Sequence, residues 1–243
     1  MVFCIKCGTQ LLDEANFCNK CGAPVAASAA APSAPEKGKL TFESGAVYEG
    51  DVVNGNAHGK GKMNYANGQV YTGDFIENIP NGKGIWTFPN GEVHEGDFVN
   101  NEYHGKAKHT YPNGNIYEGE YVNDKKCGKG KLTFASGNIY EGDFVDGAFH
   151  GKGKYTYVEG DVYEGDWVDD KKCGKGKYTF AEGEVYEGDW VDGNCHGKGK
   201  YVYANGDVYE GDFVDDYRHG KGKYTHADGR VTEGNFENGK FIG

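Results

Sequence analysis

From residue 37 to residue 243, aromatic and glycine positions alternate with charged positions along the chain. Tyr178 and Phe180, for example, lie on either side of a polar residue, and Lys177 precedes them. Successive side chains of a β-strand point to opposite faces, so this pattern predicts strands with one aromatic-and-glycine face and one charged face. Helices are disfavoured, because each glycine inside a helix costs about 1 kcal/mol.

The pattern repeats every 23 residues. A motif of Tyr-Glu-Gly-Asp followed by an aromatic residue, or a variant of it, occurs once in each repeat. The motifs start at Tyr48, Tyr71, His94, Tyr117, Tyr140, Tyr163, Tyr186, Tyr209 and Thr232. Nine such units fill residues 37–243, so we expect no separate catalytic domain within this sequence.

Two turns are predicted in each unit. The first contains a glycine that recurs from Gly45 to Gly229. We expect a three-residue loop there, with the glycine in the left-handed conformation, because this loop length keeps the aromatic residues of both strands on one face. The second turn carries Asn-Gly or Asp-Gly in several units, as at Asn54-Gly55. Two turns give two strands per unit, about 18 in all. The sequence therefore predicts an all-β fold, an elongated single-layered antiparallel β-meander of nine 23-residue hairpin repeats, with Lys facing Glu or Asp on the charged face.

The residues from Tyr163 to Trp167 (Tyr-Glu-Gly-Asp-Trp), together with the Cys-Gly-Lys-Gly sequence that follows, resemble the MORN repeat (membrane occupation and recognition nexus). A His-Gly-Lys-Gly version begins at His150, and the resemblance covers residues 37–243. It implies an elongated, twisted, single-layered antiparallel sheet with a groove. The last unit departs most from the motif, with Thr232 in place of Tyr, as is typical of a terminal repeat that meets solvent.

Four cysteines near the N-terminus form two Cys-x-x-Cys pairs. They are Cys4, Cys7, Cys18 and Cys21. Four thiolates in this arrangement predict a tetrahedral structural Zn²⁺ site. Residues 1–22 are too few to bury a core, so we expect the metal to supply most of the folding energy. The segment is similar to the short zinc-ribbon module at the start of many prokaryotic proteins. A disulfide interpretation is disfavoured, because the sequence has no export signal.

Residues 23–36 are rich in Ala, Pro and Ser, a composition typical of a semi-extended tether. We therefore expect three parts: a zinc ribbon at residues 1–22, a linker at residues 23–36 and the repeats at residues 37–243. The ribbon and the repeats are expected to be separate bodies. The ribbon, with as many Lys as acidic residues, is interpreted as a protein contact or a cap.

Composition narrows the classes of function. The chain carries 26 Lys and Arg against 37 Asp and Glu, a net charge of −11, which disfavours nucleic-acid binding. An aromatic content of 14% argues against a disordered chain. No apolar run approaches the ~20 residues of a membrane-spanning helix, and no secretory signal is present, so we expect a cytoplasmic location.

The repeated acidic and metal-ligand residue types are interpreted as structural. Acid pairs such as Glu164 and Asp166 recur in almost every unit, which favours pairing with Lys over catalysis. A column of His and Cys that includes His150 and Cys173 places its members two strands apart, ~9.6 Å, too far to share one zinc ion. We expect hydrogen bonds of these residues inside the inter-unit turns, and no enzymatic activity.

Aromatic residues in three columns share one face of the predicted sheet. A single-layered sheet has no second layer to cover that face, so part of it stays accessible and forms a groove for a partner. The predicted groove residues are Trp86, Phe88, Tyr111, Phe134, Tyr155, Tyr157, Tyr178, Phe180, Trp167, Trp190, Tyr201 and Tyr203.

Two functions stay open from the sequence. The first is a non-enzymatic scaffold that binds a protein partner, as a peptide or a helix, along the aromatic groove, with the zinc ribbon as an accessory module. The second, implied by the family name, is membrane association through anionic phospholipid or phosphoinositide. The net negative charge disfavours this alternative, because anionic bilayers repel such a surface. A homodimer through the free strand edge of the terminal repeat is a further expectation.

Overall fold

The computed structural model of the 243-residue chain describes residues 2–3, 10–11 and 34–243. Two short strands, β1 (Val2–Phe3) and β2 (Gln10–Leu11), pair antiparallel. The predicted zinc ligands Cys4, Cys7, Cys18 and Cys21 lie outside the described residues, as does the predicted linker up to residue 33.

The other strands follow one another in a single series. They are β3 (Glu36–Thr41), β4 (Val47–Val53), β5 (Asn56–Asn64), β6 (Val70–Ile76), β7 (Ile79–Thr87), β8 (Val93–Val99), β9 (Glu102–Thr110), β10 (Ile116–Val122), β11 (Lys125–Thr133), β12 (Ile139–Val145), β13 (Ala148–Thr156), β14 (Val162–Val168), β15 (Lys171–Thr179), β16 (Val185–Val191), β17 (Asn194–Val202), β18 (Val208–Val214), β19 (Tyr217–Thr225), β20 (Val231–Glu237) and β21 (Lys240–Phe241). The described residues contain no helix.

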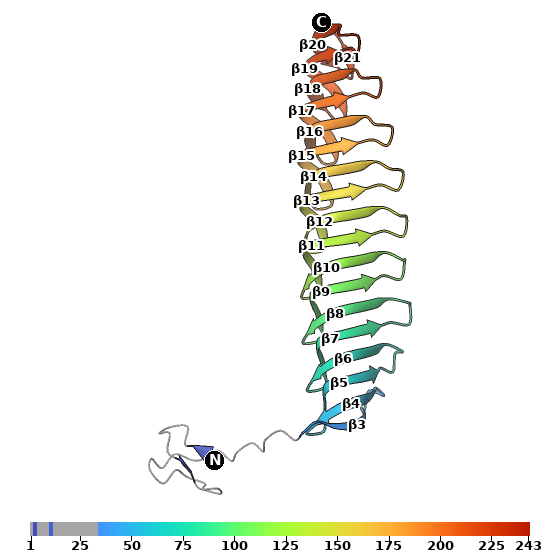
Figure 1. Cartoon of the computed structure of the whole chain (residues 1–243), viewed down its shortest axis with the longest axis vertical. Helices are drawn as coiled ribbons and strands as arrows, with labels where there is room; N and C mark the ends of the chain where they lie inside the picture. Colours follow the sequence, from blue (N-terminus) through green and yellow to red (C-terminus); the bar gives the residue numbers. More distant parts are fainter. Residues whose placement is uncertain (1, 4–9, 12–33) are drawn as a thin grey trace.

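Each strand from β3 to β21 pairs antiparallel with the next, and Figure 1 shows the elongated stack that results. Within residues 34–243, no pairing joins β21 back to β3, so the sheet of 19 strands is open. The predicted all-β, single-layered antiparallel meander is confirmed. The sheet has 19 strands and not the predicted total of about 18, because β21 adds a short strand after the last turn.

The loop within each unit has the predicted form. In the seventh unit, the Phe180 N–H donates to the Glu184 carbonyl at 2.9 Å, which leaves three loop residues. Gly183 has φ +94° and donates its N–H to the Phe180 carbonyl at 2.9 Å. Tyr178 then lies opposite Tyr186, so the aromatic residues of both strands share a face. The same two hydrogen bonds recur in all nine units.

The turn between units has two residues, and both have positive φ. Asp192 (φ 49°) and Gly193 (φ 96°) connect Val191 to its partner Asn194. This conformation matches the right-handed twist of the flanking strands and accepts Asn, Asp or Gly with little strain. Those residue types fill every such position except that of Glu77.

A register shift follows most of these turns. Gly188 pairs with Gly199, but Asp189 pairs with His196, so the later strand holds two extra residues. One of them, Gly197, has φ 61°. Bulges of this kind bend a strand. The aspartate at the shift stabilises the bulge, since Asp189 accepts the Lys198 N–H at 2.9 Å.

The core is a row of tyrosines lying over paired glycines. Tyr140 is fully buried and donates its hydroxyl proton to the Asp143 carbonyl at 2.9 Å. A Cβ atom added to Gly153 would lie 2.5 Å from the Tyr140 hydroxyl oxygen, so the ring needs glycine beneath it. Aromatic residues two strands away meet these tyrosines edge to face, as Trp167 on β14 meets Tyr140 on β12 at 5.4 Å between ring centroids. Interlocked rings therefore build a core without a second layer.

Candidate partner-binding surfaces

Aromatic rings continue outward from this core as an unbroken row. Successive ring centroids lie 4.5 to 6.0 Å apart. We call the row the aromatic ladder, and its members are Tyr155, Tyr157, Tyr178, Phe180, Tyr201, Tyr203 and Tyr224. Each member is half-buried, so one side of every ring packs on the sheet and part of it meets solvent.

The structure divides the twelve predicted groove residues into two groups. Trp86, Trp167 and Trp190 are only 8%, 4% and 5% exposed, and they pack into the core. The other nine are half-buried, and six of them belong to the aromatic ladder. Phe134 contacts the ladder through Tyr155, at 5.9 Å between ring centroids. Tyr224 extends the ladder beyond the predicted set.

Carboxylates from the preceding loop hold three of the tyrosine hydroxyls of the ladder. Tyr178 donates to Asp161 at 2.6 Å, and Tyr224 donates to Asp207 at 2.6 Å. Tyr201 makes the equivalent bond to Glu184. Burial, followed by the bond to Asp207, raises the pKa of Tyr224 to about 12. These bonds link each unit to the next and fix the rings in place.

Cations cover the buried tyrosines in alternate units. Lys126, Lys172 and Arg218 occupy equivalent positions at the start of β11, β15 and β19. The Lys172 Nζ lies 4.4 Å from the ring centroid of Tyr178 and 5.0 Å from that of Trp190. Burial lowers the pKa of Lys172. These cations were not predicted on the aromatic face. In the register each lies opposite an aromatic residue, as Lys172 pairs with Trp167.

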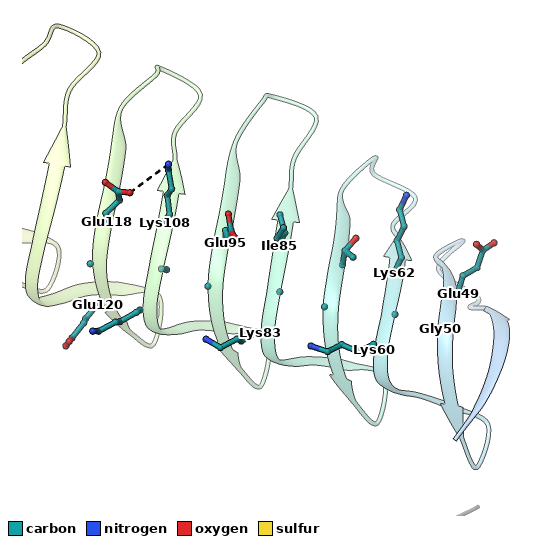
Figure 2. Close-up of a pocket in the computed structure, with 18 of the residues that line it drawn as sticks. Glu49, Gly50, Lys60, Lys62, Lys83, Ile85, Glu95, Lys108, Glu118 and Glu120 are labelled. Atoms are coloured by element: carbon teal, nitrogen blue, oxygen red, sulfur yellow. Dashed lines mark ion pairs between the residues drawn. The ribbon is translucent and has the colours of Figure 1, made fainter. Parts of the chain in front are cut away.

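A shallow groove runs along the opposite, charged face. Glycines form its floor and charged side chains form its walls, as Figure 2 shows for Lys60, Lys83 and Glu95. Two stretches of 1130 and 1180 Å³ meet at Lys129. The predicted pairing of Lys with acidic residues is present, for example between Lys60 and Asp74 at 2.7 Å.

Most charges in the walls of this groove are neutralised by ion pairs. Lys129 and Asp143 form one such pair at 2.7 Å, and the hydrogen bond from the lysine lowers the pKa of Asp143. Exposed pairs of this kind contribute about 0–1 kcal/mol each, so they balance charge more than they stabilise the sheet. Acid pairs that resembled catalytic carboxylates are thus already engaged with lysines.

The His and Cys column lies in the inter-unit bends. His150 Nδ1 is 3.9 Å from Asp169 and, although buried, makes no hydrogen bond. The expected hydrogen bonds are therefore wrong for this residue. Within residues 34–243, no three His, Cys, Asp or Glu side chains are grouped to hold a metal ion. The described part of the chain also has no helix long and apolar enough to cross a membrane.

Comparison with known families agrees with both sequence resemblances. A zinc-ribbon domain model matches residues 3–25. The MORN repeat model matches eight consecutive segments, at residues 48–70, 71–93, 94–116, 117–139, 140–162, 163–185, 186–208 and 209–229. The eight matched segments begin at the first eight motif positions, and the ninth motif, which begins at Thr232 and departs most from the pattern, is not among them. No curated protein sequence matches the chain.

Several solved structures show weaker similarity. The TCP domain of SAS-4 from Drosophila melanogaster, in complex with a proline-rich motif of Ana2, is 17% identical, with 65% of this chain and 88% of that chain covered and a TM-score of 0.41. The TCP10 domain of CPAP from Danio rerio is 13% identical, with 83% and 94% covered and a TM-score of 0.43. Such TM-scores do not establish a shared overall fold, so no function is transferred from these proteins.

Proposed function

The chain belongs to the MORN repeat family, and from this premise we propose that it is a non-enzymatic scaffold that binds a protein partner along the aromatic ladder. The observation that carries the proposal is the unbroken row of half-exposed rings, which rests on the core and in which carboxylates hold three of the tyrosine hydroxyls. Aromatic side chains that are already held in place lose little entropy on binding and are enriched among the residues that dominate protein interfaces.

The shape of the ladder favours an extended partner. Its rings recur at each 23-residue repeat, so a peptide strand or a helix lying along the stack meets them in succession. Lys172 and Arg218 add positive charge directly beside the ladder, because they lie over Tyr178 and Tyr224 as well as over core rings. A segment that combines aromatic or aliphatic residues with acidic ones fits this surface best.

The zinc ribbon is proposed as an accessory contact or a cap. Cys4, Cys7, Cys18 and Cys21 offer the four sulfur donors of a closed structural zinc site, which holds a fold together and performs no reaction. The family match at residues 3–25 supports this donor set. A second module on the same chain would raise the effective concentration for a shared partner.

The phospholipid alternative has weaker support. Most lysines of the row that includes Lys60 pair with a carboxylate of a neighbouring strand, and the net charge of −11 repels anionic bilayers. We propose a cytoplasmic location, with membrane association only under this alternative. Sedimentation with anionic and neutral vesicles tests the phospholipid alternative. Binding to anionic vesicles that is weakened by salt would establish the lipid function. No binding at low salt would exclude it.

Photo-crosslinking on the two faces tests the proposal. A photoreactive phenylalanine analogue replaces Phe180 on the aromatic ladder in one variant and Lys177, an exposed residue of the charged face, in the control. In cells of the source organism, we expect defined protein crosslinks from position 180 and few from position 177. Equal crosslinking from both positions, or crosslinks from position 177 only, would contradict binding on the aromatic face.

A further inference from the structure

In most repeats, one side chain covers the buried tyrosine, and it comes from the strand after the inter-unit turn. In the fifth repeat, Phe149 stacks on Tyr140 with ring centroids 3.7 Å apart. In the third repeat, Tyr103 stacks on His94 at 3.5 Å. Lysine or arginine takes this covering position in the fourth, sixth and eighth repeats. The core rings beneath these side chains are fully buried, and Tyr186 in the seventh repeat is only 1% exposed as well.

The seventh repeat lacks a side chain of sufficient size at this position. Its covering residue is Cys195, and a cleft of 400 Å³ lies there. Tyr186 forms part of the cleft wall, and Lys172 and Asp216 also line it. Ala57 is equally small in the first repeat, but it is fully buried, so the protein itself fills that space.

The cleft has the walls that surround a phenylalanine elsewhere in the chain. Five rings contact Phe149 in the fifth repeat, at centroid distances from 3.7 to 6.4 Å. They belong to Tyr140, Phe144, Trp167, Tyr155 and Phe134. The residues two repeats later, in the same order, are Tyr186, Trp190, Phe213, Tyr201 and Phe180, and all five line the cleft.

The geometry points to this cleft as a pocket for one aromatic side chain of the protein partner. The inference rests on the proposed function and adds a recognition element to it. Two rings of the aromatic ladder, Phe180 and Tyr201, border the cleft, so a segment lying on the ladder passes directly over it. Cavities of ~150 Å³ already hold benzene, so the volume accommodates a ring with part of its backbone.

A cationic side chain fits this pocket less well than an aromatic one. Lys172 already brings a positive charge to the wall, and like charges in a partly desolvated site repel. The thiol adds no charge, because burial raises the pKa of Cys195 to about 12. Asp216 balances the charge of Lys172 in the wall, so a neutral ring enters without needing a further counter-charge.

The test compares Cys195→Phe with Cys195→Ser in the full chain. We use p-cresol, the side-chain analogue of tyrosine, as the probe and detect binding by saturation-transfer NMR. The wild type and C195S are expected to bind p-cresol, and C195F is expected to lose that binding and to melt at a higher temperature, because its ring fills the cleft as Phe149 does. Equal p-cresol binding by C195F and wild type, with C195F folded, would overturn the inference, and so would binding of methylguanidinium in place of p-cresol.

Crosslinking from position 180 separates the inference from the proposed function. If C195F sharply reduces the partner crosslink while C195S retains it, the pocket is used by the partner. If the crosslink persists unchanged in a folded C195F, the pocket inference is wrong but partner binding on the ladder stands. If neither the wild type nor C195S crosslinks a partner, the proposed function fails and the partner assignment of the pocket fails with it.

Discussion

At the scale of single residues, the repeat pattern changes at two nearby positions on the paired strands β8 and β9. His94 replaces the buried tyrosine, and Ala107 replaces one glycine of the pair beneath it. In the second repeat, a Cβ atom added to the equivalent Gly84 would lie 2.3 Å from the hydroxyl oxygen of Tyr71. The methyl group of Ala107 thus occupies the space that a tyrosine hydroxyl needs, and the smaller histidine makes room for it.

This compensation predicts strong coupling between the two positions. His94→Tyr alone should destabilise the protein by ~1–3 kcal/mol through overpacking. Ala107→Gly alone should cost ~1 kcal/mol, from backbone entropy and a small void. The double variant restores the arrangement of the other repeats and should be at least as stable as the wild type. Urea unfolding of the four proteins measures the coupling, and additive effects of the two changes would refute the account.

His94 also predicts how stability depends on pH. Burial, together with the neighbouring His109, lowers the pKa of His94 to about 3, below its ordinary 6.5. The unfolded chain binds a proton near pH 6.5 and the folded chain does not, so stability is fully present above that pH and falls as the pH decreases. The slope approaches ~1.4 kcal/mol per pH unit.

The double variant His94→Tyr/Ala107→Gly is the matched control for this effect. Between pH 6.5 and 4.5, the free energy of unfolding of the wild type should decrease more steeply than that of the double variant. Carboxylates with lowered pKa values, such as Asp143, are present in both proteins, so the comparison isolates the contribution of His94. Parallel curves for the two proteins would exclude His94 as the source of the pH dependence.

At the scale of elements, glycine has two different roles in the repeat. Gly153 lies beneath the Tyr140 ring, where an added Cβ atom would lie 2.5 Å from the hydroxyl oxygen. Gly147 lies in an inter-unit turn with φ 93°, and an added Cβ atom there would meet no other atom within 4 Å. Gly153 is required because there is no space for a side chain, and Gly147 is required only because of its backbone conformation.

Alanine at each position separates these roles. Gly153→Ala should cost ~1–3 kcal/mol or more and should change the near-ultraviolet circular dichroism of the aromatic core. Gly147→Ala should cost ~1–2 kcal/mol, the strain of a left-handed alanine, and should leave that spectrum unchanged. Thermal and urea unfolding of the two variants, together with the near-ultraviolet spectrum of each, check the prediction. An aromatic spectrum altered equally by both changes would argue against the glycine-tyrosine packing.

Much of the element structure could be predicted from the sequence, because it depends on local rules. The three-residue loop around Gly183 followed from the requirement that Tyr178 and Tyr186 share a face. The register shift at Gly197 was not predicted, because it depends on which of several glycines takes a positive φ. The positions of Lys172 and Cys195 on the aromatic face were also missed. Each lies six residues before a ring of that face, Tyr178 and Tyr201, so strict alternation along the strand was the signal for them.

At the scale of the whole molecule, the two edges of the sheet are protected from further strand pairing in different ways. Residues 240–243 fold back on β20, where the Ile242 N–H donates to the Asn235 carbonyl at 2.9 Å. The free edge expected at the last repeat is therefore partly covered, and the proposal of a homodimer through it needs that segment to be displaced. Within residues 34–243, β3 has a single hydrogen-bonded neighbour and carries Lys37 and Lys39, charges that discourage edge-to-edge pairing.

The zinc ribbon and the repeats are expected to fold independently. Replacing Cys4 and Cys7 with Ser removes two of four proposed ligands, so the bound zinc should fall from about one ion per chain to none. The β-sheet signal in far-ultraviolet circular dichroism and the melting temperature of the repeats should not change, because the repeats form their own core. Metal analysis and thermal melts check both parts. Loss of the sheet signal would refute the independence of the two parts.

Peptide selection against the two faces tests the central claim most directly. Peptides selected on the full chain from a random library are measured by fluorescence anisotropy against three proteins: the wild type, a Phe180→Ser/Tyr203→Ser variant of the ladder, and a Lys177→Ser/Lys200→Ser variant of the charged face. The account predicts peptides that contain aromatic residues, with affinity reduced at least about tenfold by the ladder variant and little changed by the charged-face variant. Peptides that bind the ladder variant as tightly as the wild type, or that lose affinity only for the charged-face variant, would contradict binding along the aromatic ladder.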